Sequence, residues 1–352
     1  MAASTPRPFD GSPRTAPSAR PRADMVWVPG GLFLMGSEDF YPEERPVHTA
    51  RVAGFWMDRH PVTVAQFRRF VEATGYVTVA EIAPDALDFP DADPADLVPG
   101  SLVFTPPSAP VRLDDFRAWW SWVQGAQWRH PEGPGSTVDG LDLHPVTQVA
   151  YADAVAYAVW AGKELPSEAE WEFAARGGLD GATYAWGDEF APGGRMMANT
   201  WQGGFPVQND LLDGYDRTSP VGTFPPNGYD LVDMTGNVWE WTSQDYTSSH
   251  LGAATESFQS PSVAHGGCCG PTREAHAAQP SPSPSLAVGP PLKVIKGGSH
   301  LCAPNYCLRY RPAARQSETL DTSTGHLGFR CIVRPRSDRP PPVTAPTRML
   351  PS

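Results

Sequence analysis

The chain has 352 residues, and 27 basic against 39 acidic side chains give it a formal net charge of −12. This charge disfavours a nucleic-acid partner, because there is no surplus of cations to displace counterions from phosphates. The 40 prolines and 33 glycines indicate a loop-rich fold and not a helical bundle. No apolar run approaches the roughly 18 residues that a membrane span needs, so we expect no membrane partner.

The two ends of the chain differ in composition from its middle. Residues 1–23 are rich in Pro, Ala, Ser and Arg and lack the apolar region of a signal peptide, and residues 336–352 are again Pro-rich. We therefore expect a disordered leader at 1–23, one domain at 24–335 and a disordered tail at 336–352. Five cysteines, two of them adjacent, do not resemble a secreted disulfide framework. A reducing cytoplasm is the expected compartment.

The N-terminal half of the domain predicts a hairpin and two helices. Residues 25–37, MVWVPGGLFLMGS, have apolar residues on both sides of a Pro-Gly-Gly turn, which is typical of a β-hairpin. Residues 62–75 predict a helix with Thr63 as its N-cap and Gly75 as its stop. A second helix is expected within 147–162, where it ends at a glycine.

The third helix has the clearest signals. It lies in LPSEAEWEFAARGG at 165–178, where Ser167 and Glu170 form a capping box and a glycine pair ends the helix. From residue 180 to 248 the pattern changes, because Gly, Pro, Asn and Asp break short aromatic-rich segments. We expect irregular, turn-dominated structure there.

The C-terminal part of the domain predicts an excursion and two strands. Residues 249–290 are small and polar and predict a long surface excursion. The chain then returns in a short strand within 293–299 and closes with another within 325–335. No internal repeat divides the chain, which is therefore expected to form a single domain.

Two of the five cysteines lie close together in GGSHLCAPNYCLRYR. Four residues separate Cys302 from Cys307, so the two thiols meet only if the chain turns between them, and Ala-Pro-Asn at 303–305 is typical of a turn. A disulfide, a redox dithiol and a soft-metal site binding Cu(I) all remain open. Zinc is less favoured, because it would want four ligands and no paired Cys or His lies nearby in the sequence to complete them. The cations Arg309 and Arg311 would favour thiolate in each case.

Two further groups of residues are candidates for binding. Segments 198–216 and 227–243 combine carboxylates, amides and turn-forming backbone, which are the oxygen ligands that Ca²⁺ prefers, although the residues alone favour ordinary Asx-turns over a calcium site. Tryptophans in a glycine-rich context either line a groove for an extended ligand or fill the core. They are Trp186, Trp201, Trp239 and Trp241.

From about Met25 to Pro335 the chain resembles the formylglycine-generating enzymes, the sulfatase-modifying factor family, in their bacterial cytoplasmic form. The motifs that carry the resemblance are VPGGLFLMGS, PVTVAQFRRFVEATGY, HPVTQVAYADAVAYAVWAGKELPSEAEWEFAARGG, FPPNGYDLVDMTGNVWEWT, KVIKGGSHLCAPNYCLRYR and GHLGFRC. The paired cysteines are specific to the aldehyde-forming members. The resemblance implies a mixed α/β fold with little regular secondary structure, a single-domain variant of the C-type-lectin-like fold.

The resemblance also implies an activity. Members of the family use O₂ to oxidise the cysteine of a Cys-x-Pro-x-Arg segment in an unfolded sulfatase to Cα-formylglycine. By resemblance, Cys302 and Cys307 would bind Cu(I), and the substrate thiolate would become a third ligand. Ser299 and Trp239 would flank the oxygen pocket. A substrate that enters unfolded favours an exposed groove and a monomer.

Two structural calcium sites are implied in the same way. The first would use the side chains of Asn199 and Asp213 and the carbonyls of Thr200 and Tyr215. The second would use the side chains of Asp233 and Glu240 and the carbonyls of Gly236 and Val238.

Four other residues have weaker interpretations. Cys331 lacks the disulfide partner of secreted members and is expected to be a buried thiol, because Ala175 occupies the place of the bridging cysteine. Cys268 and Cys269 lie in the excursion and receive no role. His326 would border the peptide groove.

Two alternatives of other classes remain. A sulfoxide synthase on the same fold would use non-haem iron and need a histidine-rich triad, and the nine histidines show no such cluster. A non-catalytic, lectin-like binding module would keep calcium, but the intact cysteine pair argues against it.

Overall fold

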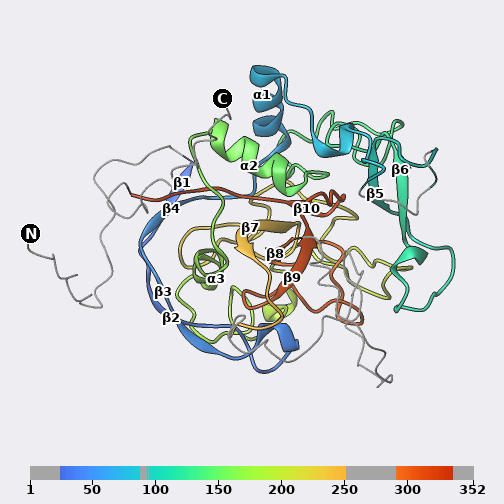
Figure 1. Ribbon diagram of the computed structural model, residues 1–352. Coiled ribbons are helices and arrows are strands. Elements are labelled where there is room, and N and C mark those ends of the chain that lie inside the picture. The colour runs from blue at the N-terminus through green and yellow to red at the C-terminus, as the bar shows by residue number, and fades with distance from the viewer. Residues whose placement is uncertain (1–23, 88–92, 94, 251–290, 336–352) are drawn as a thin grey trace, which may run out of the picture.

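The computed structural model describes residues 24–87, 93, 95–250 and 291–335. The helices within them are α1 (Val64–Thr74), α2 (Tyr151–Trp160) and α3 (Glu168–Arg176), with short 3-10 turns η1 (Pro42–Glu44), η2 (Val79–Glu81), η3 (Phe116–Ala118) and η4 (Pro192–Gly194). None of these helices has the length and apolarity to cross a membrane. The expected fold class, mixed α/β with little regular structure in a single domain, is confirmed (Figure 1).

The strands form one four-stranded sheet and three smaller ones. They are β1 (Met25–Val28), β2 (Gly31–Met35), β3 (His48–Val52), β4 (Phe55–Asp58), β5 (Gly100–Phe104), β6 (Trp120–Gln124), β7 (Trp239–Asp245), β8 (Leu292–Lys296), β9 (Arg315–Thr319), β10 (Leu327–Gly328) and β11 (Ile332–Val333). The sheets have the orders β10-β7-β8-β9, β1-β4-β11, β2-β3 and β5-β6. In Figure 1 the four-stranded sheet lies at the centre and β2-β3 runs around one side.

The predicted hairpin at 25–37 is wrong. β1 pairs with β4 and β2 pairs with β3, both antiparallel, and the two ladders keep one register. The chain therefore forms one long ribbon that bends where Gly30 faces the backbone of Ala53 and Gly54. A Cβ on Gly30 would lie 2.5 Å from the carbonyl carbon of Ala53. The Pro-Gly-Gly sequence bends the ribbon instead of reversing the chain.

All three predicted helices are confirmed, and their capping residues explain where they begin and end. The Thr63 hydroxyl accepts from the Gln66 N–H, and Gly75 ends α1 in the left-handed conformation at φ 67°. In α3, Ser167 and Glu170 form the expected reciprocal capping box. Gly177, at φ 57°, ends that helix.

The C-terminal strands differ from expectation in one respect. β8 is confirmed, but residues 325–335 contribute two short strands to two sheets, because β10 pairs with β7 and β11 pairs with β4. Residues 180–238 have no helix except η4 and no strand, as expected, whereas β7 was not foreseen. Apart from its first two residues, the excursion at 249–290 lies outside the described residues, as do 1–23 and 336–352, and those boundaries stay predictions.

The segment that carries Cys302 and Cys307 is part of the largest apolar cluster of the core. The largest apolar cluster joins α1, α2 and the central sheet, and it contains Cys302, Cys307 and Cys331. A second cluster packs α3, through Trp171 and Phe173, against the β2-β3 ribbon and the β1-β4 pair. The expectation that Cys331 is a buried thiol is confirmed.

Candidate active site

The turn predicted between the two cysteines brings their sulfur atoms together. The Cys307 N–H donates to the Ala303 carbonyl at 2.8 Å, which closes the turn. The sulfur atoms of Cys302 and Cys307 are 2.9 Å apart, and both side chains are buried thiols. This separation exceeds the roughly 2.05 Å of a disulfide bond. The arrangement permits either a disulfide or a shared soft metal ion after small side-chain rotations.

The glycine pair before the turn sets the path of the backbone. Ser299 is buried; its N–H lies 3.4 Å from the Cys302 sulfur and its carbonyl accepts from the Cys302 N–H at 2.9 Å. Gly298 has φ +68°, and a Cβ there would lie 2.7 Å from the Arg309 carbonyl oxygen. Only glycine lets the two segments of the cysteine motif approach this closely.

Replacing Gly298 with alanine is expected to destabilise the protein strongly. Gly162 is the matched control, because it has φ +65° but no atom within 4 Å of the position that a Cβ would occupy. Alanine at Gly162 should lower the free energy of unfolding by about 1–2 kcal/mol through the left-handed backbone alone. Alanine at Gly298 should cost about 1–3 kcal/mol more, because the methyl group overlaps backbone. Urea denaturation measures both, and equal losses would contradict the close approach.

Two buried residues, Trp239 and His326, have side-chain polar atoms without hydrogen-bond partners among the described residues. Trp239 is fully buried in the cluster that holds Cys302 and Cys307, and its backbone N–H donates to the His326 carbonyl at 2.8 Å. Its indole Nε1 has no hydrogen-bond partner among the described residues, and neither has either ring nitrogen of His326. Burial, with a smaller contribution from His300, lowers the pKa of His326 well below its usual value. The neutral imidazole thus offers one donor and one acceptor.

A clamp formed by residues 40–44 holds the segment that follows the turn. The Leu308 N–H donates to the Tyr41 hydroxyl at 3.0 Å, and Arg309 donates to Glu43 at 2.7 Å. Arg311 forms a bidentate pair with Glu44 at 2.9 and 2.6 Å. Both arginines were expected beside the thiols, but their carboxylate partners were not. The only signal in the sequence was that Glu43 and Glu44 are adjacent, so that their two negative charges balance the two positive charges of Arg309 and Arg311 far along the chain.

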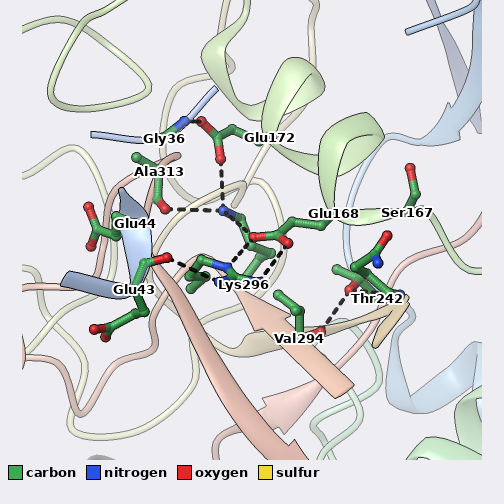
Figure 2. A network of polar contacts seen from close by, with 12 residues as sticks. Gly36, Glu43, Glu44, Ser167, Glu168, Glu172, Thr242, Val294, Lys296 and Ala313 are labelled. Carbon is green, nitrogen blue, oxygen red and sulfur yellow. Dashed lines mark hydrogen bonds and ion pairs between the residues drawn. The ribbon is translucent and has the colours of Figure 1, made fainter. Parts of the chain in front are cut away.

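The clamp continues into a buried network of charges (Figure 2). Lys296 contacts Glu172 at 2.9 Å and Glu168 at 3.7 Å. Arg176 pairs with Glu172 at 2.8 Å, and Arg315 pairs with Glu168 at 2.7 Å. Burial alone would raise the pKa of Glu172, but Lys296 and Arg176 bring it down to about 2. The network connects α3 to the strand that leads into the cysteine motif.

The residues of the first predicted calcium site lie together. Asp213 accepts from the N–H groups of Thr200 at 2.9 Å and Tyr215 at 3.0 Å. The Asn199 side-chain oxygen is buried and has no hydrogen-bond partner among the described residues. The Gln202 amide nitrogen donates to Asp213 at 2.7 Å and also contacts the Thr200 carbonyl. The predicted set therefore already contains one hydrogen-bond donor, the Gln202 amide. It also contains one buried oxygen, that of the Asn199 side chain, that accepts no hydrogen bond from the described residues.

At the second predicted calcium site, the carboxylate oxygens of Asp233 and Glu240 already accept hydrogen bonds from protein donors. Burial raises the pKa of Asp233 to about 6, although the Gly222 N–H at 2.7 Å and the charge of Arg330 oppose this. Both Glu240 oxygens accept from Arg330, and one also accepts from the Trp171 indole at 2.8 Å. The described residues hold no cluster of three or more His, Cys, Asp or Glu side chains suited to a metal. The first predicted calcium set has one carboxylate, completed by an amide and two carbonyls, and the second has two carboxylates, completed by two carbonyls.

A groove runs past the residues that precede Cys302. Its lining comprises Val64, Val103, Phe104, Trp128, Pro131, Glu132, Val138, Leu141, His144, Pro145, Thr147, Arg217, Thr218, His300, Leu301 and Gly325. Arg217 and Glu132 form an ion pair of 2.8 Å on this surface. None of the four tryptophans lines it. Of the two roles left open for them, Trp201, Trp239 and Trp241 have that of core residues, and Trp186 lines a different pocket with Asp233.

The structure combines few helices and several small sheets with a buried thiol pair, which lies at a turn after a strand of the central sheet. These features are the ones expected of the family that the sequence resembles. The chain belongs to the family described as sulfatase-modifying factor enzyme 1-like domain, whose model matches residues 11–335.

Similar proteins agree with this membership. The chain is 56% identical to a formylglycine-generating enzyme of Mycobacterium tuberculosis, over 89% of this chain and 99% of that one. It is 45% identical to the protein of the same name from Thermomonospora curvata, over 92% and 97% of the two chains. Among solved structures it resembles PvdO from Pseudomonas aeruginosa, with a TM-score of 0.54, 26% identity and coverage of 88% and 93%.

Proposed function

We propose that this protein is a formylglycine-generating enzyme, an oxidase that converts the cysteine of a Cys-x-Pro-x-Arg segment in unfolded sulfatases to Cα-formylglycine with O₂. The observation that carries the proposal is the buried pair of thiols, 2.9 Å apart, at Cys302 and Cys307. High identity to proteins of that name supports it. The family resemblance alone would also admit a non-catalytic member, but the buried thiol pair argues against one.

Cys302 and Cys307 are the residues that would hold copper. Two adjacent thiols are the donor set that soft, monovalent copper prefers over the oxygen-binding cations. A bound Cu(I) ion would supply reactivity toward O₂ and a place for the substrate thiolate. The Ser299 N–H, 3.4 Å from the Cys302 sulfur, helps to fix the orientation of that side chain.

The other residues of the site exclude water and bind small polar groups. Cys302 and Cys307 lie inside the largest apolar cluster, which keeps bulk solvent from the reacting atoms. Ser299 and the indole N–H of Trp239, which has no partner among the described residues, flank the proposed oxygen pocket. The groove beside Leu301 is the proposed path for the extended substrate peptide.

Mass spectrometry of a synthetic Cys-Thr-Pro-Ser-Arg peptide tests the reaction. The purified protein with O₂ and Cu(I) is expected to convert the peptide thiol to an aldehyde, and the metal-free protein is not. A peptide with serine in place of cysteine controls for other oxidations. A fully copper-loaded protein that leaves the thiol unchanged would contradict the proposal and leave a binding protein on this scaffold.

The chain itself contains the proposed substrate pattern, in Cys269-Gly270-Pro271-Thr272-Arg273. This segment lies outside the described residues, and its two cysteines had received no role. Assays of the proposed reaction therefore need the protein's own mass as a second readout, since an internal cysteine competes with added peptide. The variant Cys269→Ala removes the internal copy and gives the clean reference enzyme.

The first calcium site carries a further testable element of the proposal. Ca²⁺ bound by Asn199, Asp213 and the carbonyls of Thr200 and Tyr215 would satisfy the buried Asn199 oxygen. Removing Ca²⁺ with a chelator should lower the melting temperature, because an ion at 100 times its Kd stabilises by about 2.7 kcal/mol. Asp213→Asn should abolish this response, and Asp210→Asn, a nearby aspartate, should keep it. A wild-type melting temperature that ignores the chelator would contradict the site. The second site is proposed on resemblance alone.

The proposal places the protein in a reducing cytoplasm, acting as a monomer on chains that have not yet folded. Cys302, Cys307 and Cys331 are all thiols, which suits that compartment.

A further inference from the structure

The groove beside the cysteine motif contains a histidine that stands two residues before Cys302. His300 is buried, with 3% of its surface exposed, and it lines the groove together with Leu301. The charged side chains of the lining, Glu132 and Arg217, already pair with each other at 2.8 Å. A ligand in this groove therefore depends on the other polar atoms of the lining, and His300 supplies one of them.

The position of the proton on the His300 ring follows from the hydrogen bond that the ring makes. Its Nδ1 lies 2.8 Å from the Asn237 carbonyl oxygen, and because a carbonyl only accepts, Nδ1 must carry the proton. Nε2 makes no hydrogen bond within the described residues. In the uncharged ring, which burial favours, Nε2 is an acceptor with a free lone pair.

Asn237 holds the ring of His300 in one orientation. The Asn237 carbonyl also accepts from the His300 backbone N–H at 3.0 Å. Asn237 has a left-handed backbone at φ 60°, and its N–H donates to the Asn199 carbonyl at 2.8 Å. Its side chain exchanges two hydrogen bonds with the backbone of Ser219, at 3.0 and 3.1 Å. The ring cannot turn without losing its bond to a fixed carbonyl, so Nε2 is a preorganised acceptor.

A single fixed acceptor in a groove suits the main chain of an extended peptide. Each residue of a peptide offers one main-chain N–H, except proline. In a Cys-x-Pro-x-Arg segment, the main-chain donors next to the reactive thiol are therefore those of the cysteine and of the residue after it, since the proline has none. Because His300 stands two residues before Cys302, this part of the substrate is the part that Nε2 would meet.

We propose that Nε2 of His300 accepts a main-chain hydrogen bond from the substrate cysteine or from the residue after it, and thereby orients the reactive thiol toward Cys302 and Cys307. This inference rests on the proposed function, which places the peptide in this groove. His300 acts as a binding residue for the peptide backbone and takes no part in the redox step. A contact with the main chain is indifferent to side chains, which suits a motif whose second residue is not specified.

Peptides with an ester bond test the contact without any turnover. The probe is a fluorescent peptide that contains Ala-Ala-Pro-Ser-Arg, in which alanine replaces the cysteine and the residue after it. Two further versions carry L-lactic acid in place of one or the other alanine, which exchanges one N–H for an ester oxygen. Fluorescence anisotropy gives the Kd of each peptide. One of the two esters should bind the wild type about tenfold more weakly, because a buried acceptor loses its donor.

His300→Asn separates the contact from mere support of the fold. The amide nitrogen of asparagine can replace Nδ1 as the donor to Asn237, but nothing replaces Nε2. This variant should bind the amide peptide about tenfold more weakly, and should bind amide and ester within about twofold of each other. A purely structural role would weaken both and keep their ratio. His144→Phe changes another histidine of the groove, whose Nδ1 contacts the Thr218 hydroxyl at 3.0 Å, and should keep the wild-type ratio.

Melting curves identify a variant that fails to fold, and His300→Phe then replaces His300→Asn in the comparison. Equal binding of all three peptides by the wild type, or an ester penalty that persists in the His300 variant, would overturn the inference. Absence of any peptide binding by the wild type would overturn it as well. The proposed function fails on a different readout, because there the copper-loaded protein would leave a thiol peptide unconverted.

Discussion

Replacing Cys307 with serine is expected to abolish aldehyde formation, with a loss of more than about 1,000-fold in turnover, while the fold persists. The sulfur of Cys307 lies 2.9 Å from that of Cys302, and either thiol alone offers only half of the proposed copper site. Residues that act as one unit in catalysis lose nearly all activity when either is removed. Cys302→Ser should therefore match Cys307→Ser, and the double variant should be no worse. Turnover is read by peptide mass spectrometry and folding by melting curves.

Cys331→Ala is the matched control for a buried thiol outside the pair. Cys331 belongs to the same apolar cluster, so its replacement should cost stability while leaving the copper-dependent conversion in place. If either single variant of the pair kept turnover within about tenfold of the wild type, the paired-thiol account of catalysis would be wrong.

Replacing Arg330 with methionine is expected to lower the free energy of unfolding by about 3–5 kcal/mol, the cost of breaking a buried ion pair from one side. Arg330 is fully buried and donates to both Glu240 oxygens and to the carbonyls of Val232 and Asp233 at 3.0 and 2.8 Å. Methionine fills similar space but leaves a buried carboxylate and two carbonyls without these donors. Urea denaturation gives the loss directly.

Arg59→Ala is the comparison for an arginine at the surface. Arg59 pairs with Asp230 at 2.8 Å, but both side chains are exposed, and such pairs contribute about 0–1 kcal/mol. If Arg330→Met cost no more than Arg59→Ala, the Arg330 cluster would not organise the junction between β7, β10 and β11.

Local signals predicted the elements whose ends are determined by neighbouring residues. The capping groups Thr63, Ser167 and Glu170 located two helices, because a cap acts within four residues of the chain. The Ala-Pro-Asn turn placed Cys302 against Cys307 for the same reason. Glycine and proline punctuation likewise predicted the irregular stretch before β7.

Long-range pairing could not be predicted from these signals. The Pro-Gly-Gly segment carries the local pattern of a hairpin, but pairing with residues 48–58 makes it a bend in a longer ribbon. Glu43 and Glu44 lie 266 and 267 positions from their arginine partners, and nothing in their local sequence indicates burial. The pairing of these carboxylates with Arg309 and Arg311 becomes visible only when the distant segments are placed together.

Tandem mass spectrometry of a sulfatase chain co-expressed with this protein tests the central claim most directly, because it reads the motif cysteine of a natural-length substrate. The account predicts formylglycine at that cysteine with the wild-type protein, and unmodified cysteine with the Cys302→Ser/Cys307→Ser double variant. Unmodified cysteine with the wild-type protein under copper-replete, aerobic conditions would contradict it.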